Sequence, residues 1–204
     1  MKNILHFLRK LSCALVAGIS LGSTFIPAIR PAKTPSHVVL AKTHQVSKTA
    51  KNAGKNCHWS KNSAKVYLDL ADNQQLTQAS QAAISAWNDT DSFTFTETSK
   101  KKNAQITIEP MFDPDTKAAG QASITYNHKT KLLNKAKIQL NVYYLQNLMY
   151  AYSYQRIVNT VEHELGHAIG LKHNNGKSVM YPAGSVYPIE PQDIAKVKQI
   201  YHEK

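Results

Sequence analysis

The stretch VEHELGHAIGLKH, at residues 161–173, has the residue types and spacing of a metal site. His163 and His167 are four residues apart, so on a helix of about 3.6 residues per turn both imidazoles can reach one cation. His173 lies too far along to share that cation if the helix continues. Gly170 can adopt a left-handed conformation that ends the helix and turns the chain back. Since zinc accepts neutral imidazole nitrogen, the pattern predicts zinc bound by these three histidines.

Glu164 directly follows the first predicted ligand. Its carboxylate is expected beside the open coordination position, where it can take a proton from an activated water and pass it to a leaving amine. Glu162 is rotated away by about 100° of helix, so we expect an ordinary solvated or supporting carboxylate. The residues therefore predict peptide hydrolysis with Glu164 as the catalytic residue.

A methionine follows the third histidine in the stretch SVMYP, where Met180 lies seven residues after His173. A methionine turn after HExxHxxGxxH resembles the Met-turn of the metzincins. Within that clan the chain resembles the matrixins over residues 59–201, and PQDIAKVKQIY at 191–201 is similar to their C-terminal helix. The resemblance implies a zinc endopeptidase in which Met180 supports the metal site.

The resemblance also implies a mode of substrate binding. A peptide would add as an antiparallel strand to AGQASITYN at residues 119–127. Tyr181, Pro182 and the residues after them would line the main specificity pocket.

Several positions depart from the matrixin pattern. Residues 111–141 contain one histidine, His128, so we predict no structural zinc there. Asp113 and Asp115 are of a type that binds calcium, but an Asp-Pro turn is the preferred interpretation. Asn174 follows the third ligand, where animal matrixins usually have a serine.

Cys57 lies in KNCHWSK, which lacks the cysteine motif that caps the zinc in matrixin pro-segments. An inert free thiol is the preferred interpretation, with an intermolecular disulfide or a zinc-binding switch as alternatives. Removal of an N-terminal signal would leave Cys57 as the one cysteine, and no disulfide could then form within the chain.

Hydrophobic periodicity predicts the elements that position these residues. Alternation indicates strands at 64–70, 93–98, 104–110, 120–127 and 136–145, with Pro110 stopping the third. Helical spacing indicates helices at 75–90, 154–169 and 191–201. We expect an α+β fold of the zincin or metzincin type, with three helices on a mixed, mostly parallel sheet of about five strands. The zinc would lie between the sheet-bearing N-terminal part and a small C-terminal subdomain.

Charge is distributed unevenly along the 204 residues, whose formal net charge is +12. Residues 1–68 hold 11 of the 25 Lys and Arg and none of the 13 acidic residues. Residues 1–28 combine a basic start with an apolar run, which is typical of an export signal; an uncleaved anchor is the alternative. We interpret residues 29–57 as a basic linker or short pro-segment and residues 58–204 as the catalytic domain.

The sequence thus predicts a secreted, extracellular zinc metalloendopeptidase that acts on proteins or peptides as a monomer, with no nucleic-acid partner. The basic N-terminal segment could contact an anionic cell wall and keep the protein at the cell surface. A zinc amidase or peptidase for cell-wall peptides is one alternative. A non-enzymatic surface protein with a structural zinc is another, which Glu164 disfavours because a structural site needs no base.

Overall fold

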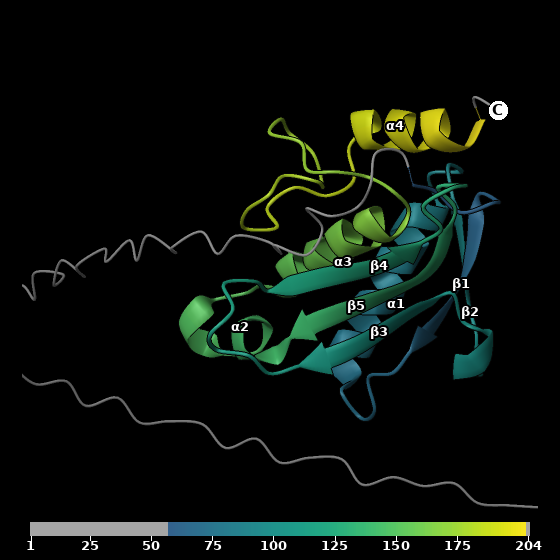
Figure 1. The fold of residues 1–204 in the computed structure, drawn as a ribbon. Coiled ribbons are helices and arrows are strands. Elements are labelled where there is room, and N and C mark those ends of the chain that lie inside the picture. Colours follow the sequence, from purple (N-terminus) through teal and green to yellow (C-terminus); the bar gives the residue numbers. More distant parts are fainter. Residues whose placement is uncertain (1–56, 203–204) are drawn as a thin grey trace, which may run out of the picture. The chain divides into compact units, whose positions relative to one another are not determined.

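The computed structural model describes residues 57–202, in which Figure 1 shows one sheet with helices packed on it. Within these residues, none of the helices has both the length and the apolar character needed to cross a bilayer. The strands are β1 (Ser63–Leu68), β2 (Thr94–Glu97), β3 (Ile106–Met111), β4 (Gly120–Tyr126) and β5 (Leu133–Asn141). The helices are α1 (Gln74–Asn88), α2 (Val142–Leu145), α3 (Tyr154–Ala168) and α4 (Pro191–His202), with short 3-10 turns η2 (Lys101–Asn103) and η3 (Leu148–Tyr150).

The sheet has the strand order β2-β1-β3-β5-β4. β1 runs parallel to β2 and β3, and β3 runs parallel to β5, whereas β4 is antiparallel to β5 and forms one edge. The predicted α+β class and the mixed, mostly parallel five-stranded sheet are therefore confirmed.

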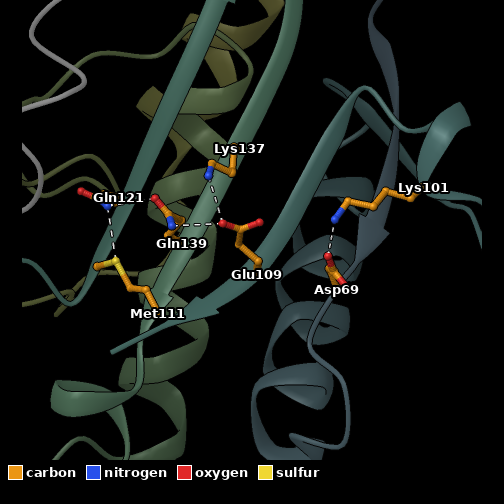
Figure 2. Close-up of polar contacts among 7 residues, drawn as sticks. All are labelled: Asp69, Lys101, Glu109, Met111, Gln121, Lys137 and Gln139. Carbon is orange, nitrogen blue, oxygen red and sulfur yellow. Dashed lines mark hydrogen bonds and ion pairs between the residues drawn. The ribbon is translucent and has the colours of Figure 1, made fainter. Parts of the chain in front are cut away.

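The two faces of the sheet differ in polarity. Ile106, Ile108 and Ile138 are fully buried in the core with α1 and α3. Their neighbours along the strands point the other way, as Figure 2 shows: Glu109 accepts from Lys137 (3.1 Å) and from the amide of Gln139 (3.0 Å). This alternation sets the face on which a helix can pack, and so it positions α3.

Pro110 does not stop β3, contrary to the prediction, because the strand continues to Met111. The carbonyl of Ile108 accepts from the Asp69 amide on the β1 side (2.8 Å). Residues two apart along a strand face the same neighbour, so the missing N–H of Pro110 points to where β1 has already ended.

The strand predicted at 136–145 is also displaced. β5 begins earlier, at the buried Leu133, and ends at Asn141. Residues 142–145 form the short helix α2, whose first turn is capped by the Asn141 side chain. The side-chain amide of Asn141 also donates to the carbonyls of Asp113 (2.8 Å) and Ala118 (3.0 Å). The periodicity of a single segment cannot predict these contacts with another part of the chain.

Candidate metal centre

Helix α3 ends just before Gly170, as predicted from the sequence. Gly170 has a φ of 102°, which suits a residue without a side chain. The amide of Leu171 donates to the Gly166 carbonyl (2.9 Å), and that of Gly170 donates to the His167 carbonyl (3.0 Å). These two bonds form a Schellman motif, which satisfies the last carbonyls of the helix and turns the chain.

Two distant side chains complete this helix end. The indole of Trp59 donates to the Ala168 carbonyl (2.9 Å), and the hydroxyl of Tyr201 donates to the Ile169 carbonyl (2.9 Å). The segment before β1 and helix α4 thus both support the turn that carries His173. Sequence reasoning missed this support, because the contacts join residues far apart in the chain.

The three predicted ligands come together. One ligand atom from each of His163, His167 and His173 lies within 4.8 Å of the others, and Nε2 of His167 lies 3.2 Å from Nε2 of His173. His163 and His167 are buried and His173 is exposed, so the site opens on the loop side. Such a group could hold one metal ion.

The chemistry of the two helix histidines fits zinc. Nδ1 of His163 lies 2.6 Å from the Val179 carbonyl, and Nδ1 of His167 lies 3.0 Å from the Leu171 carbonyl. A donating Nδ1–H leaves the Nε2 lone pair for a metal. Burial lowers the pKa of His167 to about 4 and that of His163 well below its usual range, so both rings are neutral at pH 7. Nε2 of His163 is buried without a hydrogen-bond partner in residues 57–202, as expected of a ligand atom.

Glu164 is fully buried beside these ligands, on the same helix. Neither carboxylate oxygen has a hydrogen-bond partner within the described residues, and burial raises its pKa to about 8. A Cβ added to Gly120 would lie 2.9 Å from Oε1 of Glu164, so the start of β4 passes directly over this carboxylate. The predicted base is thus enclosed between α3 and the edge strand.

Of the two expectations for Glu162, a solvated or a supporting carboxylate, the solvated one is wrong. Glu162 is 3% exposed, and burial raises its pKa to about 7, partly offset by a backbone hydrogen bond from Ile189. The segment before α4 covers it, which the periodicity of α3 alone does not show.

Met180 directly follows Val179, whose carbonyl lies beside Nδ1 of His163, and it is 1% exposed. A Cβ on Gly166 would come within 2.4 Å of its sulfur, so the glycine in HELGH is needed for this contact. Asp193 at the start of α4 holds the turn by accepting from Ser178 Oγ (2.5 Å) and the Val179 amide (2.9 Å). Neither role follows from the HExxHxxGxxH spacing alone.

The weaker candidates lie elsewhere. Oδ1 of Asp113 accepts from the amides of Asp115 (2.9 Å) and Thr116 (3.1 Å), which is the geometry of the preferred Asp-Pro turn. Among residues 57–202, the group of three or more His, Cys, Asp or Glu side chains that lie close enough together to share a metal ion is the histidine triad. Asp113 and Asp115 are not part of such a group among these residues. Cys57 is 3% exposed in the core, outside this group, and burial raises the pKa of its thiol.

Comparison with known proteins agrees with this geometry. The model of the matrixin family matches residues 55–202, which include the whole sheet, the triad and α4. No curated protein matches the chain significantly in sequence.

Proposed function

The chain belongs to the matrixin family, and from this premise we propose that it is a secreted zinc endopeptidase in which Glu164 is the general base. Family membership by itself indicates zinc metallopeptidase activity. The observation that carries the finer proposal is the convergence of three imidazoles beside a buried carboxylate that lacks a hydrogen-bond partner in the described residues.

The ligands of the zinc ion would be ring nitrogens of His163, His167 and His173. Bound zinc supplies Lewis acidity, which lowers the pKa of a water molecule and polarises a peptide carbonyl. The protein contributes neutral imidazoles, whose ring orientations are set by the carbonyls of Val179 and Leu171.

Glu164 would carry the proton. Its carboxylate accepts a proton from the attacking water and passes it to the nitrogen of the departing amine. No donor within residues 57–202 competes for its oxygens, so both oxygens are available to take up the proton.

The proposed substrate-binding strand is β4, which has one edge that pairs with no other strand among residues 57–202. The carbonyl of Ala119 accepts from the backbone N–H of Asn141 on the β5 side (2.8 Å). Because backbone groups alternate along a strand, those of Gly120, Ala122 and Ile124 point to the free edge. An antiparallel peptide would bind through these groups, which constrain its side chains little.

Two other functions remain to be distinguished. The acid-free, basic residues 1–68 support an enzyme that contacts an anionic cell wall and cuts wall peptides. A non-enzymatic protein with structural zinc is less well supported, because such sites usually have four protein ligands and the described residues offer a group of three. We propose that the protein acts outside the cell as a monomer.

The test uses the full-length protein, wild type and Glu164→Gln, with zinc content measured by mass spectrometry. Cleavage is followed with a quenched unstructured protein and with isolated cell wall. The variant should retain zinc and lose about 10²–10⁴-fold in rate, as expected for loss of a general base. Glu97→Gln, at an exposed position on β2, serves as the matched control.

Undiminished cleavage by Glu164→Gln would contradict the mechanism. Cleavage of wall material without cleavage of protein would favour the alternative enzyme. Zinc binding without either activity would favour a structural site.

A further inference from the structure

Residues 183–189 lie along the first half of α3 and are attached to it by helix side chains. Arg156 donates to the carbonyl of Gly184 through Nε (3.1 Å) and Nη2 (3.0 Å). Asn159 donates its amide to the carbonyl of Ser185 (3.1 Å). Gly184 and Ser185 have φ values of 80° and 48°. Both residues are therefore in the left-handed region, which is uncommon for a residue other than glycine, such as Ser185.

The side chain of Ser185 points inward from this segment. Its hydroxyl lies 2.9 Å from Oγ1 of Thr160, which itself lies 2.8 Å from the Arg156 carbonyl. Ser185 is 5% exposed and Thr160 is fully buried. These two small side chains therefore fill the space between the segment and the helix, one turn before Glu164.

The edge strand and this helix run in the same direction. The start of β4 lies on the middle of α3, since a Cβ on Gly120 would come within 3.0 Å of both Thr160 and Glu164. The turn after β4 pairs with the residue preceding Trp59, and Trp59 donates to the Ala168 carbonyl at the end of α3. The end of β4 is thus at the end of α3.

This direction decides where each part of a substrate would lie, if the proposed function holds. A peptide antiparallel to β4 has its later residues towards the start of β4. With the bond to be cut beside Glu164, the residue after the cut would lie near Thr160, one helical turn earlier, and near Ser185, which contacts Thr160. We propose that its side chain points towards Thr160 and Ser185, which limit it to a small one, such as that of glycine, alanine or serine.

A cavity near His173 does not relieve this limit. Its volume is about 890 Å³, and it lies beyond His173, between the following loop and α4, lined in part by Leu171, Asn174 and Lys196. A long side chain after the cut would instead have to displace Ser185. The two hydrogen bonds from Arg156 to the Gly184 carbonyl oppose that displacement.

The test compares two quenched peptides that differ only in the residue after the cut, alanine in one and leucine in the other. The full-length wild type should cleave the alanine peptide at least about tenfold faster in kcat/KM, since pocket size discriminates by about 10–200-fold. Ser185→Gly deletes the blocking side chain and tolerates the positive φ. It should cut the leucine peptide at least about tenfold better relative to alanine.

Ser99→Gly, the same substitution at an exposed site after β2, should keep the wild-type preference. Equal cleavage of both peptides by the wild type would overturn this inference and leave the proposed function standing. An unchanged preference in a folded, zinc-containing Ser185→Gly protein would overturn it as well. Absence of cleavage of every peptide and protein would instead contradict the proposed function and everything that rests on it.

A measurement on the wild type alone covers the case in which Ser185→Gly does not fold. Mass spectrometry of the fragments from a denatured protein identifies the residue after each cut. Small residues should dominate at these positions, and a majority of leucine, phenylalanine or tyrosine would refute the inference.

Discussion

The proposed metal centre joins a helix and a loop that hold its candidate ligands in different ways. His163 and His167 are buried on α3, and each has its second ring nitrogen beside a backbone carbonyl. His173 is exposed and lies in the loop that follows Gly170. The helix presents two ligands wherever α3 forms, whereas the third depends on how the chain leaves the helix. The placement of the two helix histidines therefore depends on local helix geometry, whereas the placement of His173 depends on tertiary structure.

Removal of single ligands should give the largest contrast. His163→Ala should weaken zinc binding by at least about 100-fold, because even changes around a ligand cost about 10–100-fold. His173→Ala should weaken it less, since the two helix imidazoles remain oriented. Competition with a chromogenic chelator measures both affinities, and His128→Ala, outside the site, is the control. A greater loss for His173→Ala would show that the loop, and not the helix, dominates binding.

Substitution of Gly170, in the turn between the helix and the loop, should have the next largest effect, on stability. Gly170→Ala should destabilise the protein by about 2–4 kcal/mol, because of the φ of 102° and a Cβ only 2.5 Å from the Cys57 carbonyl oxygen. Urea unfolding measures the change. Gly176→Ala is the control, since its Cβ would meet side-chain atoms and no backbone, the nearest being an Asn174 oxygen at 3.3 Å. Equal effects of the two substitutions would mean that the turn does not constrain the chain.

Glu164 on α3 should make the unfolding free energy of the metal-free protein depend on pH. Burial raises the pKa of Glu164 from 4.5 to about 8, so its contribution to stability is present below pH 4.5 and is lost as pH rises towards 8. Glu164→Gln lacks this loss and should gain about 1.4 kcal/mol over the wild type for each pH unit in that range. Urea unfolding with chelator at several pH values tests this. A difference that does not change with pH would contradict it.

The supports behind the loop should have the smallest effect. Tyr201→Phe removes the donor to the Ile169 carbonyl and the acceptor of the Trp59 backbone N–H (3.3 Å), and should cost about 1–2 kcal/mol of unfolding free energy. Tyr67→Phe is the control, since no hydrogen bond of its hydroxyl is found within residues 57–202. A loss for Tyr67→Phe as large as for Tyr201→Phe would mean that the bond contributes nothing measurable.

The same contrast explains what the sequence could predict. Helix α3 was expected at 154–169 and is found at Tyr154–Ala168, because its apolar face repeats at helical spacing. The spacing of its histidines and Gly170 likewise brought the predicted ligands together, because each step follows from local backbone geometry.

The failures concern contacts between distant segments. Glu162 is buried by the segment before α4, and Gly166 is needed by Met180, fourteen residues later. The α2 helix replaced the last four residues of the strand predicted at 136–145, directly after Asn141, whose side chain binds the loop before β4. Periodicity describes one element at a time, so it does not contain these contacts.

Helix α4 has a consequence for timing during synthesis. Tyr201 and Asp193, which hold the turns on either side of His173, are made after every predicted ligand. A chain still emerging from the ribosome can form α3 before α4 exists, but it lacks the partner that secures the third imidazole. The architecture thus postpones completion of the proposed site until α4 has been synthesised.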